Sequence, residues 1–159
     1  MGITINPVAE SDRPWVEEVF RSWGADFVVT RGRKVCPEET EGLYAADERG
    51  RRIGLLTFQI AGTQCEVVTL DAFEKFRGIG TALMDRAVAL ARARGCTRVW
   101  LITTNDNLDA IRFYHRRGLV IAHVHVGAIT ESRRLKPSIP LLGAYGIPIR
   151  DEIEFELVL

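Results

Sequence analysis

The chain has 159 residues, of which 47% are apolar and 26% are charged, the balance of a globular domain and not of a long disordered segment. Its 21 Lys and Arg residues match its 21 Asp and Glu residues, which argues against a protein built mainly to bind nucleic acid. The length predicts a single domain over residues 1–159.

Membrane spans, disulfides and metal sites are not expected. The longest apolar runs, such as 99–102, fall far short of the roughly 18–20 residues that a membrane helix needs. The first residues lack the basic and apolar regions of a signal peptide. Cys36, Cys65 and Cys96 lie far apart and form no CxxC pair, so neither a disulfide framework nor a zinc site is predicted. We expect a cytoplasmic protein that does not contact membranes.

The first half of the chain predicts one helix and several short strands. A strand over 3–5 precedes a helix that begins near Ser11, carries an apolar stripe at four-residue spacing and ends at Gly24. Residues 25–42 are expected to form a loop with at most a short strand. Three strands over 43–46, 53–60 and 65–71, separated by turn-forming residues, predict an antiparallel meander.

The second half alternates between the two periodicities. Residues 78–94 and 107–117 predict helices, whereas 98–104, 119–129 and the alternating segment 152–159 predict strands. The proline- and glycine-rich residues 130–150 are expected to form a long loop. The pattern indicates an α/β fold, with a mixed, mostly antiparallel sheet of about six or seven strands flanked by about four helices.

The loop before the helix at 78–94 indicates a phosphate site. Gly78 and Gly80 let backbone N–H groups converge, a helix N-terminus attracts anions, and Lys75 and Arg77 add positive charge. A Walker A loop is excluded because no lysine precedes Thr81, and Leu83 replaces the small third residue of the dinucleotide fingerprint.

A second segment indicates which class of phosphate-containing ligand the loop binds. An apolar strand is followed by Asn107, Ala110, Tyr114 and Gly118. Together with the glycine loop at 75–80, this segment resembles the GNAT superfamily, the Gcn5-related N-acetyltransferases, in both motifs and in the order of elements along nearly the whole chain. The resemblance implies a single-domain GNAT fold that transfers an acetyl group from acetyl-CoA to an amine, with no metal.

The resemblance also implies which residues bind the donor. The pyrophosphate loop falls on Lys75, Phe76, Arg77, Gly78, Ile79, Gly80 and Thr81. Lys75 departs from the usual Arg or Gln of the family and lacks the planar donor geometry of arginine. The backbone of Leu70 would contact pantetheine and polarise the thioester carbonyl. Asn107 would contact pantetheine, although it also suits a plain helix N-cap.

Two side chains are expected to carry catalysis. By the same resemblance, Tyr114 would protonate the departing thiolate of CoA, although an aromatic residue on a short helix is also typical of the core. Glu66 is the candidate base, since it shares the strand parity of Leu70 and would point to the same face unless a bulge intervenes. Asp71 is the alternative base, on the opposite parity, and Glu66 could equally be a solvating strand residue.

Other features leave alternatives open. His123 and His125 have metal-pair spacing but lack a third ligand, so packing on a sheet is expected. Trp23, Phe27 and Arg31 lie where members of the family often shape the acceptor pocket, and Trp23 also fits a core stripe.

The segment 130–150 would cover the acceptor or mediate a homodimer. Its cations would meet an acidic acceptor or form a solvated face; they are Arg133, Arg134 and Lys136. The acceptor is expected to be a small amine, with a protein amine as the alternative. A non-catalytic sensor or interaction module that binds acyl-CoA is the competing function.

Overall fold

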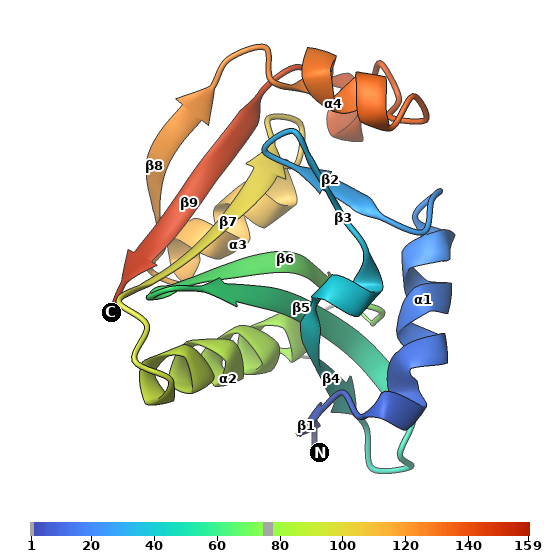
Figure 1. Cartoon of the computed structure of the whole chain (residues 1–159), viewed down its shortest axis with the longest axis vertical. Coiled ribbons are helices and arrows are strands. Elements are labelled where there is room, and N and C mark those ends of the chain that lie inside the picture. The colour runs from blue at the N-terminus through green and yellow to red at the C-terminus, as the bar shows by residue number, and fades with distance from the viewer. Residues whose placement is uncertain (1, 75–77) are drawn as a thin grey trace.

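One mixed sheet of seven strands forms the centre of the computed structural model, which describes residues 2–74 and 78–159 (Figure 1). The strand order is β1-β4-β5-β6-β7-β9-β8, and only β6 and β7 run parallel among the described pairs. The strands are β1 (Thr4–Pro7), β4 (Glu41–Ala46), β5 (Arg52–Ala61), β6 (Gln64–Ala72), β7 (Arg98–Thr104), β8 (Val120–His125) and β9 (Glu152–Val158). A separate hairpin joins β2 (Val28–Thr30) to β3 (Arg33–Val35).

Four α-helices flank the sheet: α1 (Arg13–Ser22), α2 (Ile79–Ala93), α3 (Leu108–Arg116) and α4 (Ile129–Leu135). These elements confirm the expected fold class. Short 3-10 turns cover Glu10–Asp12, Pro37–Glu39 and Ala144–Gly146.

The two faces of the sheet have different coverings, and we name them after their helices. On the α2 face, α2 and α3 bury Leu83 and Tyr114 against the main apolar core. On the α1 face, Val16 and Phe20 of α1 pack against Leu55 of β5. The hairpin β2–β3 and helix α4 continue this second layer toward β7 and β9 (Figure 1). The result is a three-layer arrangement in which the sheet separates two distinct environments.

Strands β6 and β7 separate before they end. Their paired residues run from Gln64 and Arg98 to Val67 and Leu101, whereas the strands continue to Ala72 and Thr104. Backbone groups beyond the last pair therefore border an opening in the middle of the sheet.

A β-bulge lies where the two strands separate. Thr57 pairs with Thr69 while Phe58 pairs with Val67, so Val68 is an extra residue in β6. The bulge reverses the side-chain parity along the strand. The expectation that Glu66 and Leu70 point to one face is therefore wrong, because their partners in β5, Gln59 and Leu56, lie on opposite faces.

Two segments differ from the sequence prediction. Residues 25–42 contain a complete hairpin, whose turn at Arg31 and Gly32 has positive φ values of 52° and 71°, as a tight hairpin turn requires. The segment 130–150 is not entirely loop: strand β8 ends at His125, and α4 occupies Ile129–Leu135, with Ile129 and Ser132 buried. A helix of this length carries too few turns to produce a clear periodic pattern.

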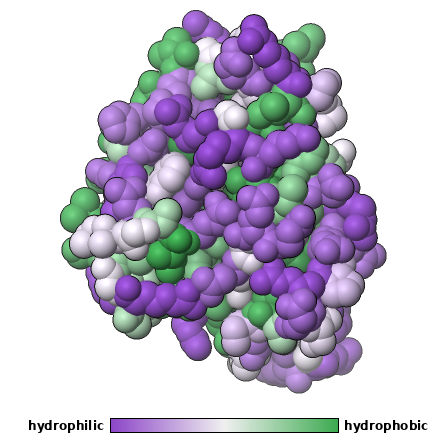
Figure 2. Space-filling view, viewed as in Figure 1, coloured by the Kyte–Doolittle hydropathy of each residue, from purple (hydrophilic) through white to green (hydrophobic). Residues whose placement is uncertain are grey.

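Most of the face of the molecule seen in Figure 2 is hydrophilic, with hydrophobic residues in scattered patches. Among the described residues, no helix has the length and apolar composition needed to cross a membrane.

Candidate active site

A cavity of about 660 Å³ lies on the α2 face, beside the separated end of β6. It falls within the range of roughly 300–1,000 Å³ typical of small-molecule sites. Six predicted site residues line it: Leu70, Gly78, Ile79, Gly80, Thr81 and Tyr114. Sequence reasoning placed these residues in two motifs about 30 positions apart, and the fold brings them to one cavity. Lys75, Phe76 and Arg77 lie outside the described residues.

The first turn of α2 offers backbone donors to this cavity. Gly78 takes the left-handed conformation, with φ of 70°, and precedes the helix without a side-chain cap. The first intrahelical bond to its carbonyl oxygen comes from the N–H of Ala82, at 3.0 Å. The N–H groups of Ile79, Gly80 and Thr81 lie before that bond and have no i–4 partner in the helix. An anion such as a pyrophosphate suits this end of the helix.

A second, basic cavity adjoins the first. It has about 320 Å³ and is lined by Thr81 of α2 and by arginines of and after α3, namely Arg112, Arg116 and Arg117. These arginines were not predicted as site residues from the sequence. The four-residue spacing of Arg112 and Arg116, which places both side chains on one side of a helix, was the available signal.

The backbone of β6 directs amide groups into the opening of the sheet. The N–H of Phe73 donates to the carbonyl oxygen of Ile53 in β5, at 2.9 Å. Hydrogen-bonding directions alternate along an antiparallel pair, so the N–H groups of Leu70 and Ala72 point away from β5 and toward the separated end of β7. Leu70 thus presents both an apolar side chain and a free amide at the cavity.

Tyr114 lies in the wall of the large cavity and also in the core. Its ring packs against Phe113 and Phe155 at centroid distances of 5.6 Å each. Burial raises the pKa of its hydroxyl to about 12, so the hydroxyl is a donor and not an anion at neutral pH. The core interpretation and the catalytic one are thus compatible, because the ring is packed while the residue lines the cavity.

Asn107 takes the N-cap position of α3, but its side chain makes no capping bond. Its amide nitrogen instead donates to the hydroxyl of Thr103, at 3.3 Å. Asn107 is also not among the residues that line the large cavity.

Both candidate bases point to the α1 face. Glu66 is buried; it accepts hydrogen bonds from the hydroxyl of Thr30 at 2.9 Å and from the guanidinium of Arg33 at 2.6 Å. Asp71 accepts from the indole N–H of Trp23 at 3.2 Å, and burial raises the pKa of its carboxyl. The bulge at Val68 gives these two carboxylates the same face.

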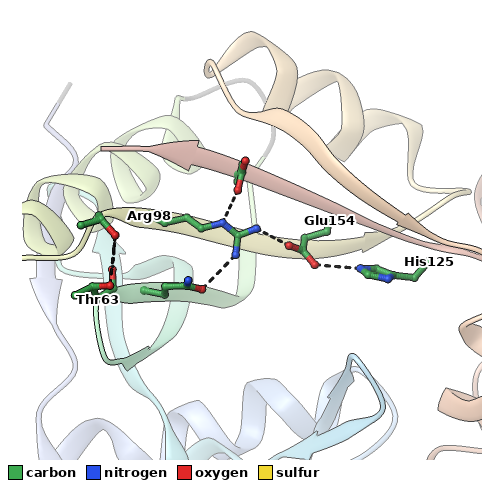
Figure 3. Close-up of polar contacts among 7 residues, drawn as sticks. Thr63, Arg98, His125 and Glu154 are labelled. Atoms are coloured by element: carbon green, nitrogen blue, oxygen red, sulfur yellow. Dashed lines mark hydrogen bonds and ion pairs between the residues drawn. The ribbon is translucent and has the colours of Figure 1, made fainter.

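A row of three glutamates extends along β9 on the same face. Glu154 and Glu156 bind the guanidinium of Arg98, and Glu154 also contacts Nε2 of His125 at 3.0 Å (Figure 3). Although burial opposes it, these contacts hold the pKa of Glu154 below its usual value. His125 therefore pairs with a glutamate. The ring of His123 lies beside that of His125, with a centroid distance of 5.7 Å.

Comparison with known proteins identifies the family of this chain. The family model described as the acetyltransferase (GNAT) family matches residues 9–119, and the chain belongs to this family. It is 42% identical to the Bacillus subtilis protein YdhI over 140 residues, which cover 87% of each chain.

Solved structures share the fold over almost the whole chain. An IAA acetyltransferase from Bacillus cereus has a TM-score of 0.72 and 17% identity, covering 99% of this chain and 100% of its own. A GNAT acetyltransferase from Elizabethkingia anophelis, solved with acetyl-CoA bound, has a TM-score of 0.71 and 18% identity, covering 99% and 98%.

Proposed function

We propose that this chain is an N-acetyltransferase that transfers the acetyl group of acetyl-CoA directly to a primary amine, in a complex of both substrates. The observation that carries the proposal is the convergence on one cavity of the first turn of α2, Leu70 with its amide directed away from β5, and Tyr114. A related fold binds acetyl-CoA in the Elizabethkingia enzyme. A small amine is the proposed acceptor.

In this proposal the donor lies along the α2 face. Backbone amides of Ile79, Gly80 and Thr81 bind the pyrophosphate, and the arginines near α3 bind a further phosphate of CoA. The pantetheine arm passes Leu70, whose amide polarises the thioester carbonyl. The thioester then lies at the opening between β6 and β7.

The reaction requires two proton transfers. The acceptor ammonium loses one proton, the nitrogen lone pair forms a bond to the acetyl carbon, and the C–S bond breaks with its electron pair on sulfur. Tyr114 donates a proton or hydrogen bond to the departing thiolate and recovers its proton from the new amide nitrogen. Each oxygen of Glu66 accepts one hydrogen bond, from Thr30 or Arg33, and keeps a second lone pair, on which it accepts the first proton through an ordered water.

Titration of the purified protein with acetyl-CoA tests the donor site. We expect saturable binding near one equivalent, weaker by about tenfold in Arg112→Met because a charged phosphate contact is lost. The substitution should weaken the binding of dephospho-CoA less than that of acetyl-CoA, since dephospho-CoA lacks one phosphate. Arg92→Met, on an exposed position of α2, is the control. Absence of calorimetric binding to the folded wild-type protein would contradict the proposal, and binding without thiol release for any amine would favour a sensor.

A Glu66→Gln variant tests the base. We expect the acid-side limb in the pH profile of kcat/KM to shift or disappear, because glutamine cannot accept the proton. The rate at neutral pH should fall about 10²-fold. Glu41→Gln removes another ion-paired glutamate, bound to Arg94 at 2.6 Å, and should keep the wild-type profile. A wild-type pH profile of kcat/KM in Glu66→Gln would show that Glu66 is not the base and that its ion pair with Arg33 is structural.

A further inference from the structure

A third cavity opens on the α1 face, behind the separated strands. It has about 220 Å³ and is bounded by the hairpin strand β2, by α4, by the middle of β6, by the end of β7 and by the start of β9. Val68 and Ile102, both beyond the last paired residues of β6 and β7, contribute to its wall. The large cavity on the α2 face borders the same strand through Leu70. The two cavities therefore meet the opening in the sheet from opposite sides.

Glu152 contributes a buried carboxylate to the wall of this cavity. The residue is only 2% exposed, yet its Oε1 is the one buried side-chain oxygen or nitrogen without a hydrogen-bond partner in the described part of the chain. The backbone N–H of Arg31, at the turn of the β2–β3 hairpin, donates to the carboxylate. Burial raises the pKa of Glu152, and the neighbouring Glu66 acts in the same direction, while the charges of Arg31 and His125 oppose it.

The other two glutamates of β9 have cationic partners, so the lack of a partner is specific to Glu152. Glu154 and Glu156 point to the same face and share the guanidinium of Arg98 (Figure 3). Glu152 contacts no cation within 4 Å among residues 2–74 and 78–159. A buried carboxylate oxygen without a partner is costly to the fold, and such groups persist where a ligand completes them.

Lys136 supplies the opposite charge in the same cavity. It follows α4, and its Nζ donates to the carbonyl oxygen of Phe27 at 3.4 Å, a long bond that leaves other donors of the ammonium group. Burial lowers the pKa of Lys136, which indicates a partly dehydrated ammonium. The neighbouring cations are engaged elsewhere: Arg133 binds the carbonyl oxygens of Pro140 and Ile149, and Arg134 pairs with Glu131.

A carboxylate and an ammonium group that line one cavity without pairing with each other fit a ligand carrying both opposite charges. The volume is below the roughly 300 Å³ at which sites for drug-sized ligands begin, so the ligand is small. Apolar side chains, including those of Val29, Ile102 and Ile139, form much of the remaining wall and suit a compact apolar body.

We propose that this cavity binds the acetyl acceptor and that the acceptor is a small zwitterion, an amino acid, with its ammonium group at Oε1 of Glu152 and its carboxylate at Lys136. The inference rests on the proposed transferase function for its chemistry but not for its binding. Glu152 holds the amine at the opening of the sheet, one N–H of the ammonium facing the carboxylate and another free to reach water and Glu66. Glu152 thereby becomes a substrate-binding residue.

Two assays test this assignment, using the common L-amino acids, β-alanine, and the methyl ester and decarboxylated amine of each as probes. In the first, thermal unfolding without acetyl-CoA should show stabilisation by at least one amino acid but not by its ester or amine. In the second, thiol release from acetyl-CoA should follow the same order of preference. The first assay remains informative even if the chain transfers no acetyl group.

Variants then assign the two charges. Glu152→Gln should raise KM for the preferred amino acid at least tenfold and leave the Kd of acetyl-CoA unchanged within twofold. Lys136→Met should raise KM for the amino acid and abolish its preference over the methyl ester. Glu156→Gln and Arg134→Met, on the same strand and just before the same lysine, are matched controls that should keep the wild-type values.

The thermal stability of Glu152→Gln distinguishes a binding role from a structural one. Since burial raises its pKa, folding disfavours the charged form above the usual carboxyl pKa, and a neutral glutamine escapes this cost. Glu152→Gln should therefore unfold at the same temperature as the wild type or higher at neutral pH while binding the amino acid less tightly. Unchanged amino-acid binding in this variant, or esters and simple amines preferred by the wild type, would overturn the proposal. If the protein binds acetyl-CoA but prefers esters or simple amines as acceptors, the amino-acid proposal fails and the proposed transferase function stands.

Discussion

Gly80→Val is expected to abolish measurable binding of acetyl-CoA. A Cβ added at Gly80 would lie 3.4 Å from Cζ and 3.6 Å from Cε1 of Phe113, already in contact with the ring. The two further methyl groups of valine must then enter the cavity between α2 and α3 or displace that ring. Both outcomes block the approach of a phosphate to the amides of the first turn of α2. We expect a loss of at least ~100-fold in affinity, about 2.7 kcal/mol.

Calorimetric titration with acetyl-CoA measures this loss directly. Ala93→Val is the matched control, because it places the same β-branched side chain at an exposed position near the other end of α2. Both variants should keep the circular dichroism spectrum of the wild type. Gly80→Ala, whose Cβ makes only ordinary contact with Phe113, should lose less affinity. Wild-type affinity in Gly80→Val would remove the α2 terminus from the donor site.

Tyr114→Phe is expected to lower kcat about 10²-fold, with acetyl-CoA affinity nearly unchanged. The substitution keeps the aromatic packing against Phe113 and Phe155 and removes only the hydroxyl. A donor with a pKa of about 12 is a weak acid, so its effect should lie at the low end of the ~10²–10⁴-fold range for acid–base groups.

The raised pKa of Tyr114 also predicts how the deficit depends on pH. Because burial raises the pKa of Tyr114, its hydroxyl stays protonated through neutral and moderately alkaline pH. The deficit of Tyr114→Phe should thus remain constant over that range, measured as thiol release at saturating acceptor. Tyr44→Phe removes a hydroxyl on the other face, beside Trp15, and should retain full turnover. Equal turnover of Tyr114→Phe and the wild type would exclude the hydroxyl from the reaction.

The proposed donor half of the site is predictable from the sequence because its signals are local. Gly78 and Gly80 indicate the start of a helix, and Tyr114 lies in a helix that follows a recognisable strand. Neither signal depends on long-range strand pairing. Strand β9 was equally clear, since Ile153 and Phe155 alternate with glutamates.

The other half depends on pairing that no local pattern encodes. The extra residue at Val68 becomes a bulge only when β6 meets β5, and it moves Glu66 to the face opposite Leu70. Glu152 has the same sequence pattern as Glu154, yet Arg98 neutralises one and not the other. The position of Lys136 depends on the packing of α4 near β2, far away in the sequence.

The opening between β6 and β7 has a consequence for how substrates enter and leave. The two cavities border it from opposite faces of the sheet, one through Leu70 and the other through Val68. With the donor and acceptor placed as proposed, neither substrate would have to pass through the binding place of the other, so the two could arrive in either order. CoA and the amide product would then leave by separate exits, and a slowly released CoA would not trap the finished amide.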